Sequence, residues 1–297
     1  MKTYLDCVPC FFRQAIEAGR MGGLSGKKQK KIIDELCVEL PKLKLSVSPP
    51  EIARVVNKLL QKHGKKQDFY AKIKEKSNNV GLRIYSKLKN KVSTSKEKLL
   101  TAIEIAILGN IIDYGAKNHL DVDKELDKLL HEDQQAIKKE RKGIFNYKQF
   151  SQHLQKAQKI LYLADNAGET VFDRVLIEQI RLMYPNKQII YAVKDKPIIN
   201  DALIKDAVDC GIDRIAEVIS SGSDAPGTVL SLCSKDFLKI YKNADMIISK
   251  GQGNFEALSG TKRSIFFLFL AKCPVIAREA KCKVGNLILL FSSNHIK

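Results

Sequence analysis

The chain contains no tryptophan and no stretch of the roughly 18 uncharged apolar residues that a membrane-spanning helix needs. Its longest apolar run, residues 265–271, has only the length of a β-strand. The first residues lack the apolar segment of a signal peptide. We therefore expect a cytoplasmic protein that makes no contact with membranes.

The chain also lacks a disulfide framework and a histidine-based metal site. Its seven cysteines are odd in number and scattered, and Cys7 and Cys10 form the only Cys-x-x-Cys pair. A cysteine zinc site usually needs a second such pair, and a redox role needs a thioredoxin-like context, so we favour packing roles for the thiols. None of the five histidines falls in the loops after the predicted strands, which argues against a histidine zinc hydrolase and a catalytic triad.

The formal net charge of +18 comes mostly from lysine and is concentrated in the first half of the chain. One interpretation is a basic nucleic-acid-binding protein. The other is a lysine-rich solvated surface that attracts small anionic substrates. Because helix-turn-helix, zinc-finger and RNP signatures are absent, we favour the second interpretation and do not expect a nucleic-acid partner.

Hydrophobic periodicity divides the chain into two halves. Residues 1–148 show helical spacing almost throughout and predict an all-helical domain. Residues 149–297 alternate short apolar runs with helical segments, which predicts an α/β/α domain with a mainly parallel sheet. The expected strands are 160–164, 188–193, 217–220, 246–249, 265–270 and 287–291, with helices near 169–183, 199–210, 227–242 and 254–260.

Polar residues follow the first two strands of the predicted sheet. Asp165 and Asn166 come directly after the first, and Asn200 and Asp201 come after the second. Carboxylate and amide oxygens are the ligands that hard divalent cations prefer. Each pair could instead cap the helix that follows, and for Asn200 a cap and a supporting role beside the metal are equally open. Two such pairs after neighbouring strands favour a metal site formed by Asp165, Asn166 and Asp201.

The next two strand ends predict an anion-binding site. Gly222, Ser223 and Asp224 open a glycine-rich loop whose N–H groups could approach an oxyanion, although Asp224 could also be an ordinary helix cap. Lys250 directly follows a buried strand and needs an anionic partner, for which phosphate is the natural candidate. The segment Gly251-Gln252-Gly253 lacks the third glycine of a dinucleotide fingerprint, and the chain has no P-loop. A nucleotide-dependent transferase is therefore an alternative that the glycine pattern does not favour.

Several segments, taken in order, resemble the damage-control phosphatase family, long catalogued as the domain of unknown function eighty-nine. The likeness is to its compact archaeal and bacterial branch and covers nearly the whole chain. The segments that carry it are Asp6-Cys7-x-x-Cys10, residues 109–113, Asp165-Asn166-Ala167-Gly168-Glu169, Asn200-Asp201, residues 222–227 and residues 250–256. So many segments in order are far more specific than any one of them.

The resemblance implies a helical domain packed on a Rossmann-like α/β/α domain. It implies a cofactor ion (Mn²⁺, Co²⁺, Ni²⁺ or Mg²⁺) at Asp165, Asn166 and Asp201, and hydrolysis of sugar phosphates or damaged phosphometabolites. The cysteine pair belongs to the pattern of this branch, which raises the weight of a functional role. The oligomeric state is not predicted.

A phosphatase mechanism assigns roles to the remaining candidates. We expect water rather than the Asp165 carboxylate to attack, because Asp165 is already a metal ligand. Glu169, at the start of the following helix, would orient the water or a neighbouring group. The expected substrate-binding residues are Asn110, Asp113, Gly222, Ser223, Asp224, Lys250 and Asn254.

Overall fold

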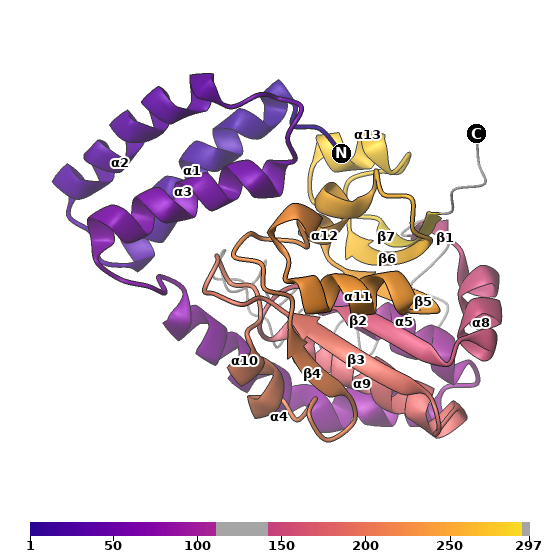
Figure 1. Ribbon diagram of the computed structural model, residues 1–297. Helices are drawn as coiled ribbons and strands as arrows, with labels where there is room; N and C mark the ends of the chain where they lie inside the picture. The colour runs from indigo at the N-terminus through magenta and orange to yellow at the C-terminus, as the bar shows by residue number, and fades with distance from the viewer. Residues whose placement is uncertain (111–141, 293–297) are drawn as a thin grey trace.

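The computed structural model describes residues 1–110 and 142–292 (Figure 1). The described chain forms a bundle of three helices and a layered unit built around one β-sheet. None of the described helices combines the length and the apolar character that crossing a bilayer requires.

The three-helix bundle consists of α1 (Val8–Met21), α2 (Gly26–Glu39) and α3 (Pro49–Gly64), with the short 3-10 helices η1 (Leu5–Cys7) and η2 (Leu40–Lys42). A capping box between Ser48 and Glu51 starts α3, and prolines occupy its first turn, where a missing N–H does no harm. The bundle has its own apolar core, which includes Phe11, Ala18, Ile32, Leu36, Ile52, Val56 and Leu60.

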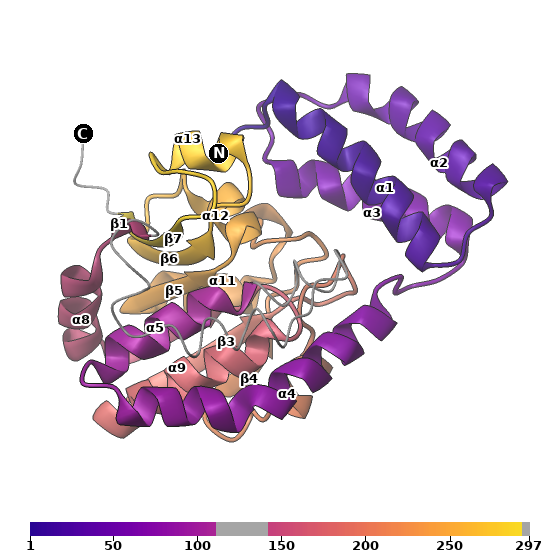
Figure 2. The same ribbon diagram turned by 180° about the vertical axis from the view of Figure 1, so that it is seen from behind.

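Residues 65–70 connect this bundle to α4 (Ala71–Thr94), which is followed by α5 (Lys98–Leu108) (Figure 2). These two helices do not join the bundle core. Their apolar residues, such as Ile84 and Ile103, share one core with the sheet, and both helices contact α9. The boundary at 148/149 therefore stays a prediction, but the described hydrophobic contacts separate the chain earlier, between α3 and α4.

Within the described residues the sheet has seven strands in the order β1-β7-β6-β5-β2-β3-β4. Among these described pairs only β6–β7 is antiparallel. The strands are β1 (Lys142–Phe145), β2 (Lys159–Leu163), β3 (Gln188–Val193), β4 (Glu217–Ser220), β5 (Met246–Lys250), β6 (Ile265–Leu270) and β7 (Leu287–Ser292). The chain runs outward from β2 to β4 and then returns to β5 on the other side of β2, so a topological switch point lies between β2 and β5.

Helices cover both faces of the sheet, and the central strands are therefore buried on both sides. On one face lie α4, α5 and α9 (Glu169–Met183), as Figure 2 shows. On the other lie α11 (Lys235–Asn243), α12 (Gln252–Leu258) and α13 (Pro274–Glu279) (Figure 1). The remaining helices, α8 (Tyr147–Lys156), α10 (Ile204–Asp209) and η4 (Leu230–Leu232), complete the order.

The predicted fold class is confirmed: a mainly parallel α/β sheet covered on both faces follows an N-terminal helical region. All six predicted strands and the helix at 169–183 are present. Three expectations differ. The helix expected from 199 begins only at Ile204, the one expected at 227–242 is divided into η4 and α11, and β1, α8 and α13 were not predicted.

Candidate active site at the switch point

The residues that follow β2, β3 and β5 meet at the switch point of the sheet, where α/β folds usually bind ligands. Backbone hydrogen bonds tie two of these segments together. The Ala202 N–H donates to the Asp165 carbonyl at 2.8 Å, and the Ala167 N–H donates to the Asn200 carbonyl at 2.9 Å. Asn166 and Asp201 form an antiparallel bridge between the same segments. The structure therefore brings the three predicted metal ligands together from two neighbouring strand ends.

Two buried asparagine amides orient the carboxylates of this site. Asn166 Nδ2 donates to Asp165 Oδ2 at 3.0 Å and to Glu169 Oε1 at 2.9 Å. Asn110 lies just beyond α5, after the residue that caps its C-terminal end. Its Nδ2 donates to Glu169 Oε1 at 2.7 Å and lies 3.4 Å from Asp165 Oδ2. The Asn110 Oδ1 atom is buried and has no hydrogen-bond partner among the described residues. An oxygen in that state suits a further polar ligand in the site.

Lys250 differs from its expected role. Its side chain is fully buried, and its Nζ lies 2.6 Å from Asp173 Oδ1 and 3.2 Å from Glu169 Oε2. Burial would lower the pKa of Lys250, but the Asp173 and Glu169 carboxylates outweigh it and hold that pKa above its ordinary value. The anionic partner that the strand end requires is thus the protein itself, and the direct contact of Lys250 with a substrate phosphate stays a prediction.

Asp173 was not predicted as part of the site, although it lies one helical turn after Glu169 on the inner face of α9. It accepts hydrogen bonds from Tyr162 at 2.7 Å and from Tyr191 at 2.8 Å, in addition to Lys250. The signal that could have identified it is a carboxylate four residues after Glu169, in line with the apolar residues Leu176, Ile177 and Ile180.

Lys272 is a second residue that the sequence reasoning missed. It lies two residues after β6, and Lys250 is the last residue of β5, so both lysines stand at strand ends and the same argument could have found Lys272. Burial raises the pKa of Asp165 well above its usual range, and the charges of Glu169 and Asp201 raise it further, while Lys272 and Lys250 oppose the shift. Burial also raises the pKa of Glu169, again against the charges of Lys250 and Lys272.

The chemistry of the donor set fits a hard divalent cation. Asp165, Asn166 and Asp201 offer oxygen donors, and the mutual repulsion of the buried carboxylates is what a cation would relieve. Gly251 keeps this space open, since a Cβ at that residue would lie 1.9 Å from Asp165 Oδ2. The set includes an amide. Among the described residues, no three His, Cys, Asp or Glu side chains alone are spaced to hold a metal ion.

The glycine-rich loop after β4 lies beside this cluster. The Gly227 N–H points to Asp201 Oδ2 at 3.4 Å, and Lys194 Nζ is 3.6 Å from the same oxygen. Gly222 has a φ of +78°, and a Cβ there would collide with the Ser234 backbone. Ser223 is fully buried within this loop, and its hydroxyl accepts from the loop's own backbone at 3.2 Å.

Two further candidates have partners inside the protein, and one cannot be placed. Asp224 accepts hydrogen bonds from Arg54 of the bundle, and its role in substrate binding stays a prediction. No described helix begins beside it, so it is not a helix cap. Asn254 is fully buried and donates to the carbonyls of Ala164 and Lys250, so it joins two strand ends. Asp113 lies outside the described residues.

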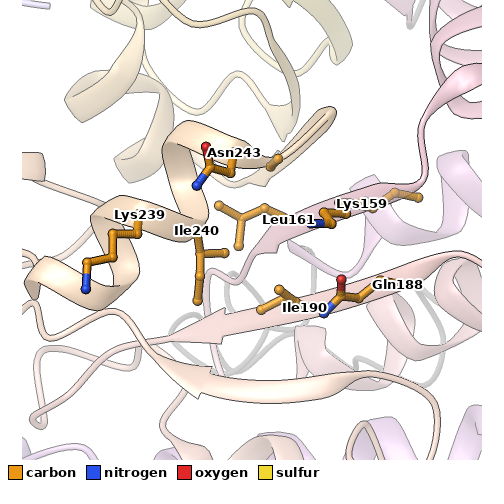
Figure 3. Close-up of a pocket in the computed structure, with 9 residues that line it drawn as sticks. Lys159, Leu161, Gln188, Ile190, Lys239, Ile240 and Asn243 are labelled. Carbon is orange, nitrogen blue, oxygen red and sulfur yellow. The ribbon is translucent and has the colours of Figure 1, made fainter.

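A separate cavity of about 200 Å³ opens between α11 and the sheet (Figure 3). Lys159, Gln188 and Lys239 are among its lining residues. Lys159 and Gln188 are the first residues of β2 and β3, so the cavity lies at the amino-terminal ends of these strands, opposite the candidate site. We do not assign it a role in the chemistry described below.

Comparison with known proteins identifies the family of the chain. The model of the damage-control phosphatase ARMT1-like domain matches residues 3–288. An uncharacterised protein of Methanocaldococcus jannaschii is 34% identical over 98% of this chain and 95% of its own length. A damage-control phosphatase of Pyrococcus horikoshii is 37% identical over 75% of this chain and 74% of its own length. A damage-control phosphatase of Archaeoglobus fulgidus is 33% identical, with 75% of each chain covered.

A solved structure extends the similarity to three dimensions. The crystal structure of a DUF89 family protein from Pyrococcus horikoshii superposes with a TM-score of 0.85 and 31% sequence identity. The match covers 99% of this chain and 100% of that chain.

Proposed function

This chain belongs to the damage-control phosphatase ARMT1-like family, and we propose that it is a divalent-metal-dependent phosphatase acting on small phosphorylated metabolites. Its substrates would be sugar phosphates or damaged phosphometabolites. The observation that carries this proposal is the junction of Asp165, Asn166 and Asp201 at the switch point, held by backbone hydrogen bonds between two strand ends. The names of two relatives support phosphatase activity.

The metal would be held by Asp165, Asn166 and Asp201. When bound, a divalent cation (Mn²⁺, Co²⁺, Ni²⁺ or Mg²⁺) would polarise a phosphoryl oxygen and neutralise charge. Glu169 accepts from the Asn166 and Asn110 amides, so it fixes the orientation of both. Lys250 in turn holds the other oxygen of Glu169. Lys250 would thereby support the ligand set through Glu169, and its direct contact with the substrate phosphate stays a prediction.

Phosphate binding would fall to groups around the ligand set. N–H groups of glycine-rich loops commonly donate to phosphoryl oxygens. In the Gly222–Gly227 loop they would first have to leave their present partners, such as Asp201 for Gly227 and the Ser223 hydroxyl for Ala225. Lys272 adds a positive charge whose influence reaches both Asp165 and Glu169. These donors would compensate the negative charge that develops on the transferred phosphoryl group.

Water is the proposed nucleophile. Its oxygen forms the new P–O bond, the ester P–O bond breaks, and the products are an alcohol and inorganic phosphate. The Asp165 carboxylate is a poor candidate for direct attack, because Oδ2 already accepts from Asn166 and the carboxylate is needed as a ligand. Trapping of a phosphorylated Asp165 would contradict this choice.

The proposal is tested by phosphate release from a panel of sugar phosphates and a chromogenic ester. Each assay is run with and without Mn²⁺, Co²⁺, Ni²⁺ or Mg²⁺, for the wild type and for Asp165→Ala. Asp236→Ala, on the exposed face of α11, is the matched control. We expect metal-dependent release that Asp165→Ala loses and Asp236→Ala keeps. Absence of release with every metal and substrate would overturn the proposal.

A further inference from the structure

The turn that precedes Asp201 contains a strained residue. The Asp201 N–H donates to the Ile198 carbonyl at 3.1 Å, and Ile199, the first central residue of this turn, has a φ of +44°. Glycine is the usual occupant of such a position. A β-branched side chain with positive φ is a genuine outlier and persists only when its surroundings stabilise it.

The three-helix bundle supplies those surroundings. The half-buried side chain of Ile199 packs against the bundle core, although the residue belongs to the loop after β3. Asn57 of α3 donates to the Pro197 carbonyl of the same loop at 3.3 Å. Arg54, one helical turn earlier in α3, donates two hydrogen bonds to the carboxylate of Asp224 in the loop after β4, one of them from Nη2 at 2.8 Å. The bundle therefore contacts the loop after β3 and the loop after β4.

The turn at residues 198–201 also fixes the candidate metal ligands. Asn200 accepts from Ala167, and the residue after Asp201 donates to Asp165, so a shift of the turn moves Asp201 relative to Asp165. Both ligands are buried, at 3% and 8% exposure, which leaves little freedom for side chains to compensate. A displacement of the loop would therefore change the spacing of the ligand oxygens.

We propose that Ile199 is a positioning residue through which the three-helix bundle sets the place of Asp201 in the metal site. The strain at Ile199 is offset by the contact of its side chain with the bundle core. The bundle is then a working part of the site although it contributes none of the proposed ligands. This inference rests on the proposed function.

The test compares Mn²⁺ affinity, measured by electron paramagnetic resonance of free Mn²⁺, in full-length variants. Ile199→Gly accepts the positive φ but removes the anchor, and we expect it to weaken Mn²⁺ binding about tenfold, the usual effect of losing a supporting contact. Ile199→Val keeps a branched apolar anchor and should bind Mn²⁺ with nearly wild-type affinity. Leu36→Ala removes a fully buried side chain of α2 from the same core and leaves Ile199 and the Asn57 contact with the loop in place. It should lower the melting temperature and leave Mn²⁺ affinity unchanged.

Unchanged Mn²⁺ binding in Ile199→Gly would overturn the inference, because local hydrogen bonds alone would then hold the turn. Equal weakening in Leu36→Ala would also overturn it, since general loss of bundle stability would explain the effect. Phosphate release is measured in parallel. Wild-type protein that binds Mn²⁺ and releases no phosphate contradicts the proposed function, while the comparison of variants still decides the role of Ile199. Wild-type protein that binds no Mn²⁺ overturns both.

Discussion

Replacement of Asp173 by asparagine is the sharpest test of the buried network beneath the site. The substitution keeps the shape of the side chain and removes its charge. Of the two ion pairs that fully buried Lys250 makes with described residues, the one with Glu169, at 3.2 Å, then remains. One of Tyr162 and Tyr191 loses its acceptor, because an amide has one oxygen where the carboxylate has two.

The expected magnitude follows from what is left unpaired. Removing one partner of a buried ion pair typically costs about 3–5 kcal/mol, because the other charge stays desolvated. For a chain of this size each kcal/mol corresponds to roughly 2–4 °C, so we expect Asp173→Asn to melt about 10 °C below the wild type. Asp173→Asn combined with Lys250→Met removes both charges and should recover part of this loss.

The assay is thermal unfolding followed by circular dichroism at one pH and salt concentration. Asp236→Asn is the matched control, because its partner Lys239 is 75% exposed and exposed pairs contribute little. A melting temperature for Asp173→Asn within about 2 °C of the wild type would refute the reasoning. So would a double variant as unstable as the sum of the two single variants, since the charges would then be uncoupled.

Three further predictions concern the site and its neighbourhood. Gly251→Ala should abolish Mn²⁺ binding in a direct titration, because its Cβ would overlap Asp165 and φ is +79°; retained binding would contradict the close approach. Lys272→Met should lower kcat/KM for phosphate release by about 100-fold, as loss of a charge-stabilising donor typically does, and unchanged kinetics would exclude Lys272 from the site. Burial raises the pKa of Glu256 to about 7 from 4.5, against the Gln252 amide. Its contribution to stability is therefore present below pH 4.5 and is lost as the pH rises through about 7. Unfolding free energies measured from pH 4 to 8 should fall less in Glu256→Gln, and parallel curves would contradict the shift.

The elements that the sequence predicted are those with a strong local signal. Central strands such as β2 and β6 read as continuous apolar runs because both of their faces are buried. β1 was missed because it is an edge strand of four half-buried residues whose partner, β7, lies far along the chain. The sequence also could not predict that α4 and α5 pack on the sheet and not in the three-helix bundle. Helical spacing shows that a helix has an apolar face, but not which core that face joins.

For the site, the sequence was informative where residues lie at strand ends. The rule that ligands gather at the carboxyl ends of parallel strands was enough to group Asp165, Asn166 and Asp201. It could not show that Lys250 is neutralised by Asp173, since that pairing depends on the distance between α9 and β5. Nor could it show that Ile199 has a positive φ, or that its side chain packs against helices more than a hundred residues away.

The most direct test of the central claim is the metal dependence of phosphate release by the wild-type chain. The protein is stripped with a chelator, assayed, and assayed again after titration with Mn²⁺, beside Asp201→Asn treated in the same way. We predict that release disappears on chelation, returns saturably with Mn²⁺ in the wild type, and does not return in Asp201→Asn. Phosphate release that survives chelation, or that Mn²⁺ restores equally in both proteins, would contradict the account.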